Sequence, residues 1–154
     1  MKDIKNTLND HVFASDLSEK VNFSDFSKKK FIIYFYPKDD TPGCTKEAID
    51  FQKFQKDFKK LGYSIIGVSK DNVEKHKKFK KKHNFDFELF SDLDGKICET
   101  FGVWVEKSMY GKKYMGIERS TFIVHEDFEI KKSWKKVKVN GHVEEVLNFI
   151  QNLN

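Results

Sequence analysis

The sequence predicts an α/β fold with a central mixed β-sheet flanked by helices on both faces. Short apolar runs alternate along the chain with stretches in which apolar residues recur every three or four positions, the patterns of buried strands and amphipathic helices. No internal repeat or Gly/Ser/Pro-rich linker divides the 154 residues, so we expect one domain over residues 1–154. Right-handed crossovers then make the early strands parallel.

The first strong strand pattern is the continuous apolar and aromatic run at residues 31–36, typical of a central strand buried on both faces. Pro37 ends it, and a polar loop leads to Cys44, where a helical pattern begins. Gly62 is the expected C-cap of that helix, and residues 63–69 form the next buried strand. The apolar residues of the helix recur at intervals of three and four: Ala48, Phe51, Phe54, Phe58 and Leu61.

The rest of the chain continues the alternation and closes with two strands and a helix. Asp71 or Asn72 can cap a helix whose buried face includes His76 and Phe79. Weaker strand signals at residues 12–14 and 20–23 predict an N-terminal β-hairpin extension. The other expected elements are a strand at 87–91, a short helix at 96–101, strands at 119–124 and 129–139, and a helix over 143–153.

Charge and hydropathy exclude several classes of protein. The net charge is +5, but 24 acidic residues are interspersed with 29 basic ones, so we expect no nucleic-acid partner. The polar N-terminus lacks the apolar core of a signal peptide, and the longest apolar run is far too short to cross a bilayer. We therefore expect a cytoplasmic protein without membrane contact.

Histidine and cysteine spacing gives no sign of a metal site. The histidines are not at ligand spacing, and we expect them to be packing or surface residues: His11, His76, His83, His125 and His142. Cys44 and Cys98 are too few for a disulfide framework in a cytoplasmic chain, and they do not form a Cys-x-x-Cys pair. The spacing therefore predicts no metal site.

Cys44 is the strongest candidate for chemistry. It lies where a loop becomes the first turn of a helix, and the free N–H groups and positive dipole end there favour a thiolate. Gly43 lets a small substrate approach the backbone, and Thr41 can direct its hydroxyl toward the sulfur or act as a helix cap. Arg119 is the single arginine in a Lys-rich chain, which suggests a position that requires a planar, permanently charged guanidinium group. The alternative is an ordinary surface arginine.

Four segments in order resemble one family of enzymes. Residues 34–47, YFYPKDDTPGCTKE, contain P-x-x-x-T-x-x-C, the signature of peroxiredoxins, in the extended form of the bacterioferritin-comigratory (Q-type) subfamily. Three further segments are similar to the same subfamily: SDLDGK at 91–96, FGVW with KSMYG between 101 and 111, and GIERSTFIV at 116–124. The resemblance covers nearly the whole chain.

This resemblance implies a thioredoxin-like fold and a thiol-dependent peroxidase. The Cys44 thiolate would attack hydrogen peroxide or an alkyl hydroperoxide and become a sulfenic acid. Thr41, Arg119 and backbone amides would hold the peroxide, and Pro37 would shield the pocket from water. Glu47 would pair with Arg119 or order the loop. Thioredoxin or a similar dithiol would recycle the enzyme, and no metal or organic cofactor would be needed. Members of this subfamily are often monomeric, so we expect a monomer.

The chain departs from the common subfamily pattern at the resolving cysteine. Ile49 stands five residues after Cys44, where many members carry that second thiol. Cys98 matches the variant with the resolving cysteine on a later helix, but it is also a natural small core residue. A disulfide needs the sites to be close already or one helix to unwind. The alternatives are a one-cysteine peroxidase and a redox sensor or relay that uses an external thiol.

Overall fold

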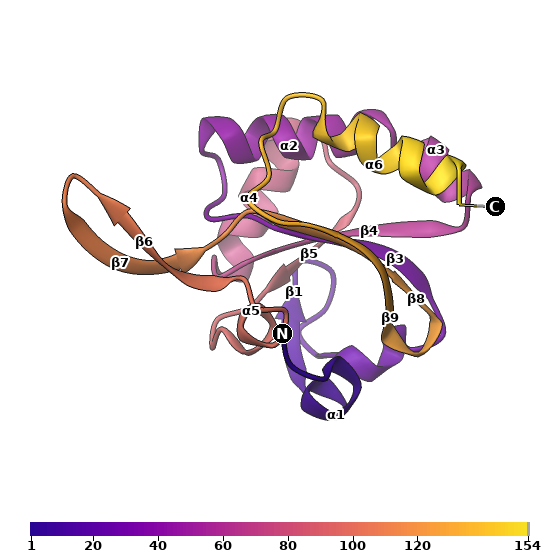
Figure 1. The fold of residues 1–154 in the computed structure, drawn as a ribbon, viewed down its shortest axis with the longest axis horizontal. Helices are drawn as coiled ribbons and strands as arrows, with labels where there is room; N and C mark the ends of the chain where they lie inside the picture. The colour runs from indigo at the N-terminus through magenta and orange to yellow at the C-terminus, as the bar shows by residue number, and fades with distance from the viewer. Residues whose placement is uncertain (154) are drawn as a thin grey trace.

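The computed structural model describes residues 1–153, and within them a seven-stranded sheet carries helices on both faces (Figure 1). The central strands β3, β4 and β5 are parallel, and the outer strands pair antiparallel. Across the sheet the order is β2 (Val21–Asn22), β1 (Val12–Ser15), β5 (Glu88–Ser91), β4 (Tyr63–Ser69), β3 (Lys30–Phe35), β8 (Ser120–His125) and β9 (Glu129–Trp134).

The alternation of side chains along β3 builds two hydrophobic cores, one on each face of the sheet. Phe31, Ile33 and Phe35 belong to the first core, which packs against α1 (Ile4–Leu8) and α5 (Lys96–Thr100). Ile32 and Tyr34 belong to the second core. The helices over the second core are α2 (Pro42–Lys53), α3 (Gln55–Lys60), α4 (Val73–His83) and α6 (His142–Gln151).

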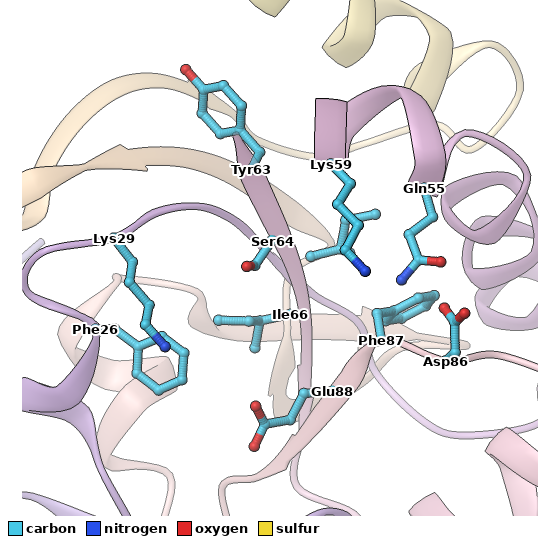
Figure 2. Close-up of a pocket in the computed structure, with 11 residues that line it drawn as sticks. Phe26, Lys29, Gln55, Lys59, Tyr63, Ser64, Ile66, Asp86, Phe87 and Glu88 are labelled. Carbon is cyan, nitrogen blue, oxygen red and sulfur yellow. The ribbon is translucent and has the colours of Figure 1, made fainter. Parts of the chain in front are cut away.

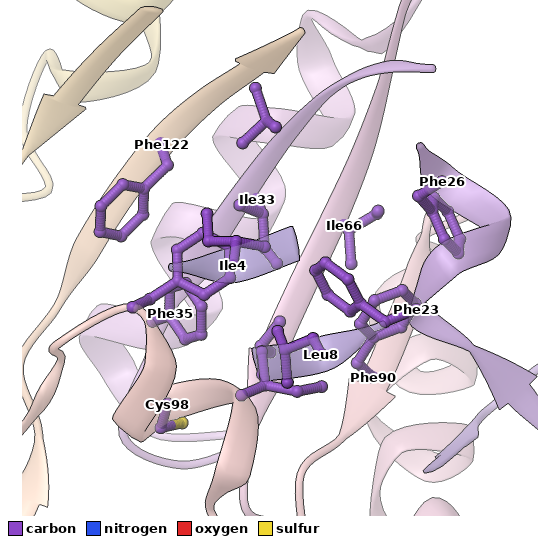
Figure 3. Packing of buried hydrophobic residues seen from close by; sticks show 14 of the residues in the cluster. Ile4, Leu8, Phe23, Phe26, Ile33, Phe35, Ile66, Phe90, Cys98 and Phe122 are labelled. Carbon is purple, nitrogen blue, oxygen red and sulfur yellow. The ribbon is translucent and has the colours of Figure 1, made fainter. Parts of the chain in front are cut away.

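Aromatic side chains dominate the first core, which Figure 3 shows from close by. The Phe13 ring on β1 lies 4.5 Å from that of Phe90 on β5, and Phe101 lies 5.0 Å from Phe122, measured between ring centroids. Contacts of this kind add to the stability gained from apolar burial alone. The N-terminal hairpin is thereby attached to the sheet through both its strand pairing and its side chains.

The structure confirms the predicted architecture. The sheet is mixed, its early strands are parallel, and helices cover both faces. The predicted N-terminal hairpin is present, with Phe13 opposite Val21. Asn72 caps α4 by accepting a hydrogen bond from the Lys75 N–H, and Gly62 follows α3 with a φ of +92°. None of the helices in the described range is both long and apolar enough to span a membrane.

Several predicted boundaries were wrong. The single helix expected after Cys44 is two helices, because Phe54 leaves the helical conformation at φ −102°, ψ 9°. Its start lies earlier, at Pro42, a residue whose fixed φ suits the first turn. The strand expected at 129–139 ends at Trp134, and Lys136 beyond it adopts a positive φ.

The sequence analysis missed a short 3-10 helix at Phe23–Phe26 and two larger features. One is the short helix α1, whose Ile4 and Leu8 are buried among otherwise polar neighbours. The other is a hairpin of β6 (Trp104–Met109) and β7 (Lys112–Ile117), which projects from the body of the protein (Figure 1). Most of its side chains are exposed or half-buried, so its sequence lacks the apolar alternation by which strands are recognised.

Candidate active site

The strand-loop-helix connection from β3 to α2 positions Cys44. Cys44 is the third residue of α2, so its sulfur lies in the helical turn whose N–H groups have no partner within the helix. The side chain is buried, with the residue 1% exposed, and belongs to the second core. Thr41 is the N-cap residue, in extended conformation.

Arg119 reaches Cys44 because β8 lies beside β3. Ser120, the first residue of β8, pairs with Phe35 at the end of β3, which places Arg119 next to the loop that follows β3. The guanidinium Nη2 donates to Cys44 Sγ at 3.2 Å, and Nη1 donates to Glu47 Oε1 at 2.6 Å. Residues that are 75 positions apart in sequence therefore meet in one site.

Charges and burial set the ionisation of this cluster. Burial alone would lower the pKa of Arg119, but the negative charges of Glu47 and Cys44 outweigh it and raise that pKa. Burial raises the pKa of Glu47 to about 7, against the opposing effect of Arg119. The guanidinium thus keeps its charge beside the sulfur, while Glu47 titrates near neutrality.

The loop residues predicted for the site differ in what they contact. Gly43 lies against the guanidinium, since a Cβ added there would be 3.3 Å from Arg119 Nη2. The Thr41 hydroxyl does not cap the helix but donates to the Lys38 carbonyl oxygen at 2.9 Å. Pro37 is exposed rather than buried, and it lies at the rim of a groove.

That groove, about 430 Å³ in volume, runs between Pro37 and the β6–β7 hairpin. Trp104 forms part of its wall, with Lys70 Nζ 4.3 Å from the centroid of its ring. Burial and the positive charge of Arg119 lower the pKa of Lys107, another lining residue. Sequence reasoning missed Lys107 because its place depends on the unpredicted hairpin.

Cys98 lies on the other side of the sheet from Cys44. It belongs to the first core, in which Figure 3 shows its sulfur near the packed apolar side chains. Both cysteines are buried free thiols. Burial and the neighbouring Asp92 carboxylate raise the pKa of the Cys98 thiol, and Asp92 also accepts a hydrogen bond from the Cys98 N–H at 2.8 Å. The structure therefore separates the two sulfurs by the sheet.

A second cavity, of about 230 Å³, lies at the start of β4, and Figure 2 shows its lining residues. The loop to Cys44 leaves from the other end of the paired strands β3 and β4, after Phe35. The lining of the cavity combines Lys29 and Lys59 with Glu88 and the start of β4. None of the residues predicted for chemistry lines it. The groove beside Pro37, in contrast, is lined by Lys107, whose pKa responds to burial and to the charges of Arg119 and Cys44, so this groove lies close to the site.

The fold also assembles two groups of potential metal ligands that sequence spacing did not indicate. One comprises His11, Asp92 and Asp94, and the other Asp39, Asp71 and His76. In the second group both ring nitrogens of His76 already have hydrogen-bond partners. Neither group contains a residue predicted to react.

A buried cysteine at a helix start, in contact with a guanidinium that a carboxylate fixes, is the arrangement of a thiol-based redox enzyme. The AhpC/TSA family matches residues 4–133 of the chain. Peroxiredoxin Bcp of Bacillus subtilis is 49% identical over 90% of this chain and 88% of its own length. Peroxiredoxin Bcp of Escherichia coli is 41% identical over 86% of this chain and 85% of its own.

Solved structures agree with these relatives. A Xanthomonas campestris peroxiredoxin Q structure superposes with a TM-score of 0.90 at 39% identity, covering 98% of this chain and 94% of that one. A second structure from that organism, described in terms of alkyl peroxide reduction and a trapped ligand complex, has a TM-score of 0.89 at 38% identity, with 98% and 95% covered. The chain belongs to the AhpC/TSA family of peroxiredoxins. It is a thiol-dependent peroxidase with a thioredoxin-like fold.

Proposed function

We propose that Cys44 is the residue that reacts with peroxide. Its thiolate forms a bond to the terminal peroxide oxygen while the O–O bond breaks, and the leaving oxygen takes a proton to become water or an alcohol. Cys44 becomes a sulfenic acid. The observation that carries this proposal is the 3.2 Å contact between Arg119 Nη2 and Cys44 Sγ.

Arg119 and Thr41 complete the peroxide site. The guanidinium lies where negative charge develops on the leaving oxygen, and Glu47 keeps it in that orientation through the 2.6 Å ion pair. Since the Thr41 hydroxyl proton is donated to Lys38, its oxygen is free to accept a hydrogen bond from the peroxide. The amides of the first turn of α2 supply further donors.

Organic hydroperoxides are proposed substrates alongside hydrogen peroxide. The groove beside Pro37 is walled by Trp104, Met115 and Ile117, which suit the carbon chain of an alkyl hydroperoxide. The related X. campestris protein is described in terms of alkyl peroxide reduction. The carbon chain of the hydroperoxide would lie in this groove, outside the protein core. Its peroxide group would extend past Pro37 to Cys44.

We propose Cys98 as the resolving thiol. Its sulfur would attack the Cys44 sulfenic acid, forming the disulfide and releasing water. Because the two thiols lie in cores on opposite faces of the sheet, α5 or the start of α2 must unwind first. The same separation, with the raised pKa of Cys98, favours the second candidate, in which an external thiol reduces Cys44 directly or receives its oxidation.

Intact mass under non-reducing conditions distinguishes these routes. One equivalent of hydrogen peroxide is added to the reduced protein and to the Cys44→Ser and Cys98→Ser variants. Loss of two hydrogens that requires both cysteines supports Cys98 as the resolving thiol, whereas oxygen gain that requires Cys44 alone supports the one-cysteine route. No rapid change in the unmodified protein would rule out peroxidase chemistry at Cys44.

Thioredoxin is the proposed reductant, in a cytoplasmic, monomeric enzyme. Peroxide reduction leaves the enzyme with an oxidised cysteine, so each turnover requires a reductant. A dithiol can reduce both the sulfenic acid and the disulfide proposed above. Continuous peroxide consumption with thioredoxin, its reductase and NADPH tests the partner. Light scattering tests the monomer, and a doubled mass would contradict it.

A further inference from the structure

A buried chain of hydrogen bonds connects α4 to the loop that precedes Cys44. The Tyr36 hydroxyl donates to Asp39 Oδ1 at 2.5 Å, and His76 Nδ1 lies 2.6 Å from Asp39 Oδ2. On its other side the His76 ring, through Nε2, lies 2.9 Å from the Phe90 carbonyl oxygen on β5. His76 is 0% exposed and Asp39 8% exposed, so water does not compete for these bonds.

Both ring nitrogens of His76 have a hydrogen-bond partner. A carbonyl oxygen accepts but never donates, so Nε2 carries a proton toward Phe90. On the other side of the ring, one hydrogen bond of 2.6 Å joins Nδ1 to Asp39 Oδ2, while the Tyr36 hydroxyl donates to Asp39 Oδ1. The two side chains form a buried hydrogen-bonded pair in which every polar atom has a partner.

This pair holds the active-site loop at its midpoint. Asp39 lies between Pro37 and Thr41, and its own N–H donates to Asp71 Oδ2 at 2.8 Å. The neighbouring Asp40 forms exposed contacts of 2.8 Å with Lys82 Nζ and 2.9 Å with His83 Nε2 at the other end of α4. Helix α4 therefore holds the loop mainly through the buried pair of His76 and Asp39, because water weakens the exposed contacts of Asp40.

We propose that His76 is a positioning residue for the peroxidase reaction, acting through Asp39. It touches neither Cys44 nor Arg119, and this inference rests on the proposed function of Cys44. By holding Asp39, it keeps Thr41 and the first turn of α2 where the Cys44 sulfur meets the guanidinium. Loss of the pair lets the loop sample conformations in which that contact is broken.

The test is a double-mutant cycle with His76→Gln and Asp39→Asn. Each single variant is expected to lower the second-order rate constant of Cys44 with hydrogen peroxide by about ten- to hundredfold, the effect of misplacing a reacting group by about 1 Å. Because the two side chains act as one unit, the double variant should be about as slow as either single variant. Trp104, in the groove beside Pro37, provides a fluorescence signal for the reaction.

Two controls separate positioning from general damage. Leu8→Ala removes a fully buried side chain from the first core, on the face of the sheet away from the loop, and should lower thermal stability without changing the rate constant of folded protein. In steady state, His76→Gln should lower kcat/KM for peroxide but leave kcat/KM for the reductant unchanged, whereas partial unfolding lowers both equally.

The outcomes are decisive in both directions. Rate losses that multiply in the double variant, or that match Leu8→Ala at equal thermal stability, would overturn the proposal. If His76→Gln cannot be purified in folded form, Asp39→Asn alone tests the proposal. Its control is Asp40→Asn, which changes only the exposed contacts and should have little effect on the rate constant. If the unmodified protein itself fails to react through Cys44, the proposed function fails and not this inference alone.

Discussion

At the scale of single residues, one guanidinium performs two tasks that no other side chain combines. Arg119 donates through separate nitrogens to Glu47 and to the Cys44 sulfur, as its planar fork allows. A lysine offers one ammonium on a flexible stem and cannot hold both partners in a fixed geometry. The identity of this residue, and not its charge alone, should therefore matter.

Arg119→Lys should lower the rate constant with hydrogen peroxide by about 10²–10³-fold, the usual cost of removing a preorganised donor from a developing negative charge. Stopped-flow fluorescence measures the reaction, and Lys107→Arg in the neighbouring groove is the matched control that keeps the charge. A variant within threefold of the unmodified rate would show that Arg119 is not needed at the transition state.

The sequence predicted which residues gather at Cys44 but not what holds their loop. The resemblance to peroxiredoxins indicated Cys44, Thr41, Glu47 and Arg119, whereas sequence order alone could not place Arg119 beside Cys44. His76 looked like a packing residue on a helix face, and its hydrogen bonds to Asp39 and Phe90 arise only when α4 folds onto the sheet. Residue spacing in the sequence does not indicate such tertiary contacts.

At the scale of elements, β4 lies at the middle of the parallel strands and carries a glycine there. A Cβ on Gly67 would approach Leu89 Cδ2 to 2.9 Å and the Tyr34 ring to 3.1 Å. Tyr34 stacks in turn on Phe51 of α2, with ring centroids 4.4 Å apart. Packing therefore requires a residue without a side chain at position 67. A larger residue there would displace Tyr34 of β3, which packs on the helix that carries Cys44.

Gly67→Ala should lower the free energy of unfolding by about 1–3 kcal/mol, the typical cost of overpacking a core. Urea denaturation followed by fluorescence gives the value. Gly116→Ala is the control within a strand, because its Cβ would meet mainly the flexible Lys107 side chain, at 3.3 Å. Equal effects of the two substitutions would contradict the packing argument.

The elements most visible in the sequence were the strands buried on both faces. Strands β3 and β4 were predicted nearly to the residue because buried apolar runs bounded by Pro37 and Gly62 are unambiguous. The β6–β7 hairpin was missed because it gains little from burial, and its pairing depends on backbone hydrogen bonds. The break at Phe54 was missed because an apolar stripe continues across it.

At the scale of the whole molecule, α6 is tied to the sheet by a buried polar contact. His142 Nε2 lies 2.8 Å from Thr121 Oγ1 of β8, and the histidine is 5% exposed. Burial and the positive charge of Arg119 lower the pKa of His142 to about 4. Protonation of this residue is therefore coupled to unfolding of the protein.

The unfolded chain binds a proton at this position near its ordinary pKa of about 6.5, before the folded protein does. Above about pH 6.5 the neutral His142 does not lower the free energy of unfolding. As the pH falls from about 6.5 to 4, proton binding by the unfolded chain lowers that free energy by up to about 3 kcal/mol. Thermal unfolding across this range should show a steeper decline than in His142→Gln. Parallel curves for the two proteins would contradict the prediction.

Because the chain contains one arginine, that residue can be labelled selectively. A dicarbonyl reagent selective for guanidinium groups has a single target, and that target is the partner of Cys44. The stoichiometry of labelling then counts intact sites directly, without a peroxide assay. Under the role proposed for Arg119, one adduct at this group would also abolish peroxide reduction.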